Sequence, residues 1–410
     1  MEEVTVQKVV HGGQGLAELA DGRKVFVWNA LPGETVRVRI IKKKRSYAEA
    51  IAEEVVVASP DRAAPREENY LATSPWQMMS LDAENRYKAE IVQELFAHEK
   101  VVLPTRSVVV HTEDEWRYRN KMEYSFWGDD DGLHLALHRR GSHGKQIVQG
   151  SELAIPALDI GANAILAELR KLDIRAGELK TIIVRCSQKG EVVVALYTKL
   201  DQFPKLVLPS EVKGLRVYHS NPKSPASVPT KLLYELGDAT LQDELLGRTF
   251  TYDVDSFFQV NLPVYEKALA RIKEHVQPEP VDMYAGVGSI GLSVGASQLV
   301  ELDRATAEMA RANAGKTEVV EADAANAIQS IVMDMPVIFD PPRAGLHAKV
   351  VARCLEVTPP QIIYLSCNPA THARDLALLQ EKYTIEFFEI YNFFPKTPHI
   401  ETLAVLSRRS

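Results

Sequence analysis

Short apolar runs alternate with stretches of helical period from Phe250 to the end of the chain. Each run is closed by glycine, proline or a polar residue, which is where a buried strand ends. Alternation of this kind is what a doubly wound sheet requires, with strands in the middle and helices on the faces. We therefore expect an α/β domain here. Its strands are predicted at Pro280–Tyr284, Gln298–Val300, Val337–Phe339, Gln361–Leu365 and Leu403–Leu406.

Cys367 lies directly after the run Gln361–Leu365 and before the helical stretch Thr371–Lys382. Asn368 can cap that helix, and Pro369 suits its first turn. Partial positive charge at a helix N-terminus favours the thiolate, and open α/β sheets bind ligands at the carboxyl ends of their strands. Cys367 is therefore a candidate nucleophile, although taken alone it is also compatible with a small buried apolar residue.

A glycine-rich turn, Gly286-Val287-Gly288-Ser289-Ile290-Gly291, follows the first predicted strand. Glycines there let the backbone turn tightly and approach a ligand closely. Glu301 ends the next run, and a carboxylate at a strand end can accept both hydroxyls of a ribose. The turn alone is compatible with a purely structural role, and nicotinamide cofactors are a competing functional interpretation.

Two further polar motifs adjoin predicted strands. Val337–Phe339 leads into Asp340-Pro341-Pro342-Arg343, where two prolines lack backbone donors and hold a rigid turn. Asp340 therefore projects from a strand end. Later, His399-Ile400-Glu401-Thr402 precedes the run Leu403–Leu406.

Five motifs, taken in order, resemble one family, the RNA 5-methyluridine methyltransferases, which use S-adenosylmethionine. The motifs are Phe257-Phe258-Gln259-Val260-Asn261, Asp282-Met283-Tyr284-Ala285-Gly286-Val287-Gly288, Asp340-Pro341-Pro342-Arg343, Ser366-Cys367-Asn368-Pro369 and His399-Ile400-Glu401-Thr402. Five ordered motifs are far more specific than any one of them. The resemblance covers nearly the whole chain, because residues 1–57 look like the TRAM-type barrel of these enzymes. Tyr118–Ser125 and His138–His143 resemble their central domain.

The resemblance implies an α/β protein in three parts. We expect an OB-like TRAM β-barrel that binds RNA over residues 1–58 and a linker with an α+β central domain over residues 59–245. A Rossmann-like class I methyltransferase domain is expected over residues 246–410. Residues 1–57 agree with a small barrel, since short β-branched runs are separated there by glycine-containing turns. A helix is predicted at Leu81–His98 and another at Ala157–Leu172.

Methylation at carbon 5 of uracil needs a nucleophile and a base, because this carbon is itself a poor nucleophile. A thiolate that adds to carbon 6 makes carbon 5 electron-rich; carbon 5 takes the methyl group, and a base then removes its proton so that the thiolate leaves. Cys367 is the candidate for the thiolate. By resemblance Glu401 is the base, although from the residues alone it is also compatible with a surface or capping glutamate. The uridine must leave its stack to reach the thiol.

The resemblance also assigns the contacts to S-adenosylmethionine. Gln259 would hold the methionine end, Glu301 the ribose and Asp323 the adenine. Asp340 could orient the uracil or the methyl donor, or could only cap a turn. The full set of expected cofactor contacts is Gln259, Tyr284, Ser289, Glu301, Asp323 and Asp340.

Many members of the family hold an iron–sulfur cluster with four cysteines, and this chain departs from that pattern. The matching stretch Asn69–Gln77 contains no cysteine, and the later position is Ser151, whereas cluster ligation needs thiolates. Cys186 and Cys354 are isolated in the sequence. We therefore expect no metal site. The histidines without ligand spacing are His111, His134, His138 and His372.

Composition places the chain among globular proteins of a reducing compartment. Three cysteines in 410 residues do not form a disulfide framework, which argues for a cytoplasmic protein. No run of about 18 apolar residues is present, so no membrane span is expected. We also expect a monomer.

RNA contacts must come from local patches, because the net charge of −7 is unusual for a nucleic-acid-binding protein. Lys42-Lys43-Lys44-Arg45 follows a strand-like run. Arg117, Arg119 and Lys121 alternate along the chain and could share one strand face. They interleave with aromatic residues, which suits a splayed RNA strand. Both groups are also compatible with a solvated charged face.

These observations predict transfer of a methyl group from S-adenosylmethionine to carbon 5 of a flipped-out uridine in structured RNA, with ribosomal RNA favoured over transfer RNA. A covalent cysteine–uracil intermediate is expected. One alternative is a methyltransferase for another base or an exocyclic nitrogen, since Asp340-Pro341-Pro342 resembles the short motif of amino methyltransferases. Another is a noncatalytic RNA-binding protein.

Overall fold

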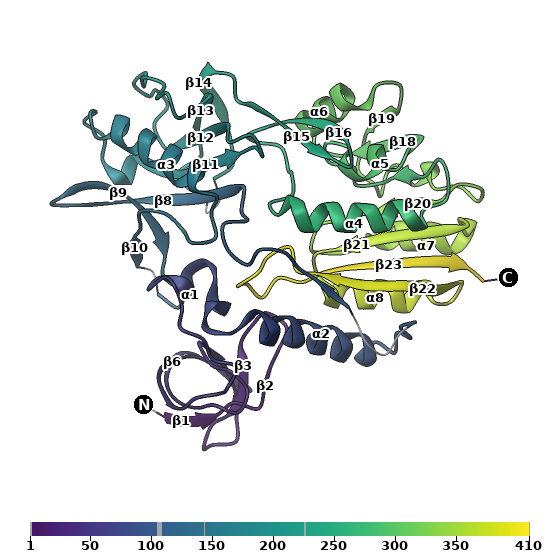
Figure 1. The fold of residues 1–410 in the computed structure, drawn as a ribbon, viewed down its shortest axis with the longest axis horizontal. Helices are drawn as coiled ribbons and strands as arrows, with labels where there is room; N and C mark the ends of the chain where they lie inside the picture. The colour runs from purple at the N-terminus through teal and green to yellow at the C-terminus, as the bar shows by residue number, and fades with distance from the viewer. Residues whose placement is uncertain (1, 105–108, 143, 225–226, 410) are drawn as a thin grey trace. The chain divides into compact units, whose positions relative to one another are not determined.

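The computed structural model describes residues 2–104, 109–142, 144–224 and 227–409 (Figure 1). His143, the last residue of one segment named above, lies outside the described residues. The chain divides into two compact units. Unit 1 contains Met1–Glu115, Arg139–His143 and Pro341–Ser410, and unit 2 contains Trp116–His138 and Gly144–Asp340. The division at residues 58 and 245 stays a prediction.

The N-terminal part of unit 1 is a curved six-stranded sheet with the order β1-β5-β6-β4-β3-β2. Alternation builds its core: in β5, Val36 and Val38 are buried while Arg37 and Arg39 are exposed. The described pairings leave β1 and β2 as edge strands, so they do not close the sheet into a ring. The strands are β1 (Glu2–Thr5), β2 (Lys8–Val9), β3 (Gly15–Glu18), β4 (Lys24–Trp28), β5 (Thr35–Lys43) and β6 (Tyr47–Val57).

A short helix, a 3₁₀ turn and a longer helix follow this sheet in unit 1. These are α1 (Tyr70–Thr73), the 3₁₀ turn η1 (Pro75–Met78) and α2 (Leu81–His98). The bounds of α2 match the predicted helix, and Ser80 caps it by accepting the backbone N–H of Ala83 at 3.2 Å. All four residues of η1 are buried, so the chain before α2 is packed.

The first part of unit 2 is a seven-stranded sheet with the order β10-β9-β8-β11-β12-β13-β14. Helix α3 (Pro156–Leu169) packs on one face, where the Tyr124 hydroxyl donates to Asp159 at 2.6 Å. A hairpin of β15 (Thr240–Leu245) and β16 (Arg248–Asp253) follows. The strands are β8 (Lys121–Asp129), β9 (Gly132–His138), β10 (Lys145–Ile147), β11 (Leu179–Cys186), β12 (Val192–Thr198), β13 (Gly214–His219) and β14 (Lys231–Gly237), with the 3₁₀ turn η2 (Ala176–Glu178) before β11.

The second part of unit 2 contains four parallel strands in the order β19-β18-β17-β20. Strands β17, β18 and β20 correspond to predicted runs, whereas β19 was not predicted. The alternation of strands and helices that the sequence predicts is therefore confirmed in this region. The elements in chain order are α4 (Leu262–His275), β17 (Val281–Asp282), α5 (Ser289–Ser293), β18 (Gln298–Glu301), α6 (Arg304–Ala314), β19 (Glu318–Glu321), the 3₁₀ turn η3 (Ile328–Ser330) and β20 (Val337–Phe339).

The C-terminal part of unit 1 has the strand order β21-β23-β22-β7. Strand β23 is antiparallel to both β21 and β22, and β7 pairs with β22 in parallel. The elements are β7 (Val110–His111), α7 (Ala348–Val357), β21 (Gln361–Ser366), α8 (Pro369–Leu379), β22 (Tyr383–Tyr391) and β23 (Glu401–Arg408). Within the described ranges, no helix is long and apolar enough to cross a membrane.

Candidate active site

The glycine turn of unit 2 connects β17 to α5 and is held by the last residue of the strand. Asp282 is fully buried, and one of its carboxylate oxygens accepts the backbone N–H of Gly291 at 2.8 Å. Gly288 has φ 89°, a left-handed conformation that favours glycine, and a Cβ there would lie 2.7 Å from Leu292. The second oxygen of Asp282 is buried without a hydrogen-bond partner among the described residues.

Glu301 ends β18 and is fixed beside this turn by the backbone. Its Oε2 accepts the N–H of Gly286 at 2.8 Å, and its Oε1 accepts the N–H of Asp303 at 2.7 Å. The side chain is half-buried. Both oxygens keep lone pairs, so the carboxylate can accept further donors from a ligand. Glu301 is therefore hydrogen-bonded to the glycine turn and still has lone pairs for a ligand.

Asp340 follows β20 and is half-buried. Burial, with a smaller contribution from the charge of Asp282, raises the pKa of Asp340 to about 7. Burial likewise raises the pKa of Asp282 to about 7, although the hydrogen bond from Gly291 opposes this. A cationic group bound near Asp340 would favour its ionised form.

Three other predicted cofactor residues also belong to unit 2. Tyr284 is half-buried in the glycine turn, and its ring meets Phe339 edge-on at 6.4 Å between centroids. Ser289 begins α5 and shares a 2.7 Å hydrogen bond with the Tyr265 hydroxyl. Asp323 follows β19, is exposed, and accepts the N–H of Ala325 at 2.8 Å.

Gln259 is buried in the loop between β16 and α4, and its carbonyl accepts Nδ2 of Asn120 at 3.0 Å. The preceding turn is built on Asp253, whose Oδ1 accepts the backbone N–H of Ser256 at 2.7 Å and its hydroxyl at 2.6 Å. Phe258 stacks on Tyr252 with ring centroids 4.2 Å apart. The loop that presents Gln259 is thus held at several points.

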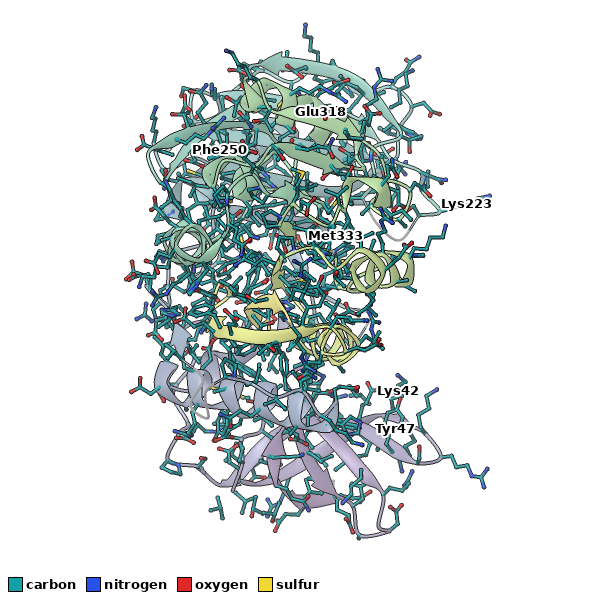
Figure 2. The ribbon with its side chains drawn as sticks, turned by 90° about the vertical axis from the view of Figure 1, so that its right-hand side faces the viewer. Lys42, Tyr47, Lys223, Phe250, Glu318 and Met333 are labelled. Atoms are coloured by element: carbon teal, nitrogen blue, oxygen red, sulfur yellow. The ribbon has the colours of Figure 1, made fainter. Side chains whose placement is uncertain are left out.

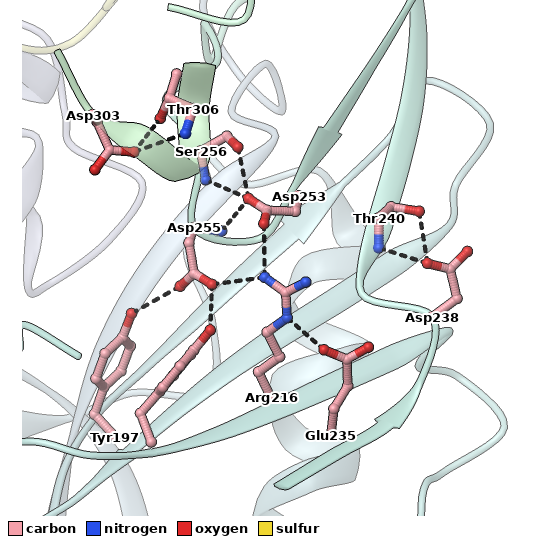
Figure 3. Close-up of polar contacts among 11 residues, drawn as sticks. Tyr197, Arg216, Glu235, Asp238, Thr240, Asp253, Asp255, Ser256, Asp303 and Thr306 are labelled. Atoms are coloured by element: carbon pink, nitrogen blue, oxygen red, sulfur yellow. Dashed lines mark hydrogen bonds and ion pairs between the residues drawn. The ribbon is translucent and has the colours of Figure 1, made fainter. Parts of the chain in front are cut away.

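Arg216 on β13 is the centre of a network that anchors this loop to the seven-stranded sheet (Figure 3). Its Nη1 donates to Asp253 at 2.7 Å and to Asp255 at 2.9 Å, and its Nε donates to Glu235 at 2.6 Å. Asp255 also accepts the hydroxyl of Tyr218 at 2.5 Å. Sequence patterns gave no sign of this network, because its members come from strands that are distant along the chain.

The nucleophile candidate lies in unit 1 at the predicted junction of strand and helix. Cys367 is half-exposed between β21 and α8. Asn368 caps α8 by accepting the N–H of Ala370 at 3.2 Å, and its Nδ2 donates to the carbonyl of Arg343 at 2.8 Å. The predicted cap is therefore confirmed.

The other two cysteines differ from Cys367 in exposure. Cys186 and Cys354 are both completely buried, and none of the three cysteines forms a disulfide. Burial raises the pKa of the Cys186 thiol to about 11 and that of Cys354 to about 12. Both thiols are thus protonated near neutral pH and poor nucleophiles.

Glu401 begins β23, next to β21, which ends one residue before Cys367. The last recorded pair of β21 and β23 is Ser366 with Thr402. The residues that adjoin this pair are Cys367, just after the end of β21, and Glu401, the first residue of β23. Glu401 is 3% exposed, so within unit 1 a thiol and a buried carboxyl group lie on adjacent strand ends.

The basic residues that were predicted to contact RNA are arranged differently from the expectation. Arg117, Arg119 and Lys121 do not share a strand face, because β8 begins at Lys121 and Arg117 has φ 56°. Arg117 instead pairs with Glu152 at 2.7 Å. Lys42 on β5 pairs with Glu49 at 2.8 Å on β6, close to Tyr47, which is labelled with it in Figure 2. This leaves Lys43-Lys44-Arg45 as the exposed basic group of that segment.

Metal binding was not expected, and the described residues include no group of three or more histidine, cysteine, aspartate or glutamate side chains arranged to hold an ion. Protein purified without oxygen should therefore be colourless and contain no stoichiometric iron. Metal analysis with absorption spectroscopy checks this. A content of about four iron atoms per chain, as in a four-iron cluster, would contradict it.

Similarity to known proteins was found along the whole chain. The family model for tRNA (Uracil-5-)-methyltransferase matches residues 294–409, and the TRAM domain model matches residues 1–52. An uncharacterized RNA methyltransferase of Lactobacillus johnsonii is 30% identical over 441 residues, which cover 99% of this chain and 98% of the relative. Another from Enterococcus faecalis is 28% identical over 449 residues, with 99% and 97% covered.

A solved structure has the same fold. It is the tRNA (uracil-54, C5)-methyltransferase of Pyrococcus abyssi in complex with S-adenosyl-L-homocysteine, with a TM-score of 0.76 and 22% sequence identity. The match covers 98% of this chain and 100% of that chain. The predicted fold class is therefore confirmed, including a TRAM domain at the N-terminus, although the described strands of that domain do not close into the predicted barrel.

Proposed function

Because the chain belongs to the family of RNA uracil-5 methyltransferases, we propose that it methylates carbon 5 of a uridine in structured RNA through a covalent bond to Cys367. Membership makes the chain an RNA methyltransferase that uses S-adenosylmethionine, as the resemblance implied. The observation that carries the proposal is that a half-exposed thiol and a buried carboxyl group lie at the neighbouring ends of β21 and β23, next to the pair Ser366 and Thr402.

The chemistry on the uracil uses the two residues of unit 1. The Cys367 thiolate adds to carbon 6, and the electron pair of the carbon 5–carbon 6 double bond moves onto the ring carbonyl as an enolate. S-adenosylmethionine supplies an electrophilic methyl group when it is bound. Carbon 5 then carries both the new methyl and its original hydrogen. Glu401 removes that proton, the double bond re-forms, and the thiolate is expelled.

Two of the proposed cofactor residues of unit 2, Glu301 and Asp340, have properties that suit S-adenosylmethionine. Glu301 keeps acceptor capacity at the end of β18, which suits ribose hydroxyls. The raised pKa of Asp340 indicates a carboxyl group that a cationic ligand would ionise. We propose that Gln259, Tyr284, Ser289, Glu301, Asp323 and Asp340 hold the cofactor.

Arg216→Met tests how the cofactor loop is held. The variant loses the ion pairs to Asp253 and Asp255, so the loop before Gln259 should become less ordered. We expect the dissociation constant for S-adenosylmethionine to rise about tenfold, which corresponds to about 1.4 kcal/mol. Isothermal titration without RNA measures it. Arg271→Met, which breaks an exposed ion pair on α4, should bind as the wild type does.

The RNA target is proposed to be ribosomal rather than transfer RNA, with a uridine that is flipped out of its stack. The experiment is to map 5-methyluridine in both RNA classes from cells with and without this gene. In a second experiment, the purified protein is tested in vitro for methylation of unmodified ribosomal and transfer RNA. A site lost only from ribosomal RNA supports the proposal. A site lost only from transfer RNA would show that transfer RNA is the target, and the proposed reaction would stay the same.

A further inference from the structure

Helix α2 buries two opposite charges in unit 1. Glu84 and Lys88 lie one helical turn apart, both side chains are fully buried, and the Lys88 Nζ is 2.9 Å from Glu84 Oε1. A buried charge is costly unless it is paired and also hydrogen-bonded to other groups. Glu84 and Lys88 are both buried, so their remaining hydrogen bonds must offset part of this cost. The residues that make these hydrogen bonds are the ones that the pair holds in place.

The side-chain hydrogen bonds that the pair makes to other residues go to the segment that joins β22 to β23. Lys88 Nζ donates to Asn392 Oδ1 at 2.6 Å and to the carbonyl of Phe394 at 3.3 Å. Glu84 accepts Asn392 Nδ2 at 2.9 Å and the backbone N–H of Lys396 at 2.9 Å. The Asn392 side-chain amide therefore bridges Glu84 and Lys88. Through these hydrogen bonds, one turn of α2 holds the segment at Asn392, Phe394 and Lys396.

Lys396 shows that the conformation of this segment is imposed by its contacts. Its φ of 63° is in the left-handed region, which is strained for a residue other than glycine. Its side chain is buried, with Nζ 2.7 Å from Glu115 and donating to the carbonyl of Met79 at 3.1 Å. Its own carbonyl accepts the N–H of Trp76 at 3.1 Å.

The segment ends at the proposed base. Glu401 is the first residue of β23 and pairs with Tyr391, the residue before Asn392. The segment therefore begins directly after Tyr391 and ends directly before Glu401, and these two residues are paired in the sheet. Burial lowers the pKa of Lys88, the charge of Glu84 opposes this most strongly, and Glu401 adds to the opposition. Glu401 is thus within electrostatic range of Lys88.

We propose that Lys88 is a positioning residue for Glu401, which it serves by holding Asn392 and Phe394 in the segment that ends at that carboxylate. This inference rests on the proposed function, because it concerns the group assigned to removal of the carbon-5 proton. Lys88 has no part in thiolate addition or methyl transfer in this scheme. Its loss should therefore slow the step that follows methyl transfer more than the steps before it.

The experiment uses Lys88→Met in the full-length protein with labelled S-adenosylmethionine and an RNA that the wild type methylates. Single-turnover methyl transfer and decay of the protein–RNA adduct on a denaturing gel are measured separately. We expect adduct decay to slow by about tenfold or more, because a misplaced general base loses part of a 10²–10⁴-fold effect. Methyl transfer should change by less than about threefold, well under that effect. A purely structural role would reduce the active fraction without accumulating adduct.

Two further variants keep the test decisive if Lys88→Met does not fold. Glu84→Gln combined with Lys88→Met leaves no unpaired buried charge, and Asn392→Ser removes the bridging amide while keeping the ion pair. Both should also accumulate adduct. Lys8→Met is the matched control, since it breaks an exposed ion pair with Glu94 on the same helix. It should behave as the wild type does.

The outcomes separate this inference from the proposal on which it rests. Adduct decay at the wild-type rate in the folded variants would overturn the role of Lys88. A Glu401→Gln enzyme that decays its adduct normally would instead remove Glu401 from proton abstraction. Methyl transfer by Cys367→Ala at the wild-type rate would overturn the covalent mechanism itself.

Discussion

A Cys367→Ala variant is expected to lose methyl transfer by on the order of 10⁴-fold or more, as enzymes do when the nucleophile of a covalent mechanism is removed. Without the thiolate, carbon 5 is not activated and cannot accept the methyl group. Affinity for S-adenosylmethionine should stay within a few-fold, because all six proposed cofactor residues belong to unit 2 and Cys367 belongs to unit 1. Single-turnover transfer to RNA and titration with cofactor measure the two effects.

Cys354→Ala is the control for this substitution. Cys354 is also in unit 1 but is completely buried on α7, so its loss should reduce stability and leave methyl transfer intact. If Cys367→Ala retains activity near that of the wild type, the covalent mechanism is wrong. An amino methyltransferase would then become the better interpretation, because Asp340-Pro341-Pro342 does not depend on the thiol.

The parts of the fold that follow from local pattern were predictable from the sequence. The helix Leu81–His98 has the bounds that its period indicates. The ends of β18 and β20 were also predicted, since apolar runs stop there at a charged residue. Cys367, Glu301 and Asp340 could be singled out because each follows such a run. In these places the local sequence and the tertiary structure favour the same conformation.

Prediction failed where conformation depends on contacts between distant segments. The first β-branched run of residues 1–57, Val4–Val10, does not form one strand. Two short strands, β1 and β2, cover it, because the N–H of Val6 between them donates to the carbonyl of Glu34 instead of continuing a ladder. Arg117 leaves the expected strand for a left-handed conformation with its side chain on Glu152. Residues such as these have no local signal that identifies their partners.

Buried charge was the least predictable feature of the candidate site. On a helix, charges at positions 84 and 88 are typical of a solvated face with an i,i+4 ion pair. Here both are buried, because Asn392, about 300 residues away, satisfies them. Arg216 is a related case, a half-buried cation whose partners Asp253 and Asp255 come from a later part of the chain. Only the tertiary structure shows that Lys88 and Arg216 anchor segments that carry proposed site residues.

Glu401→Gln is expected to trap the enzyme on its product, which makes it differ in kind from Cys367→Ala. The Cys367 thiolate can still add to carbon 6, and carbon 5 can still accept the methyl group. An amide cannot accept the carbon-5 proton, so the double bond does not re-form and the thiolate is not expelled. Turnover should fall by about 10²–10⁴-fold, the usual contribution of a general base, while a protein–RNA band carrying the labelled methyl accumulates on a denaturing gel.

Glu389→Gln is a suitable control, because Glu389 is a buried glutamate on the neighbouring strand β22 that accepts the Tyr391 hydroxyl at 2.8 Å. It should lower stability without accumulating the band. If Glu401→Gln turns over normally and forms no band, the base lies elsewhere, and Asp340, whose pKa is raised to about 7 by burial, becomes the next candidate. If the variant forms no adduct and transfers no methyl group, Glu401 acts earlier, in positioning the uracil for attack by Cys367. The band therefore distinguishes a base from a positioning group, which loss of activity alone cannot do.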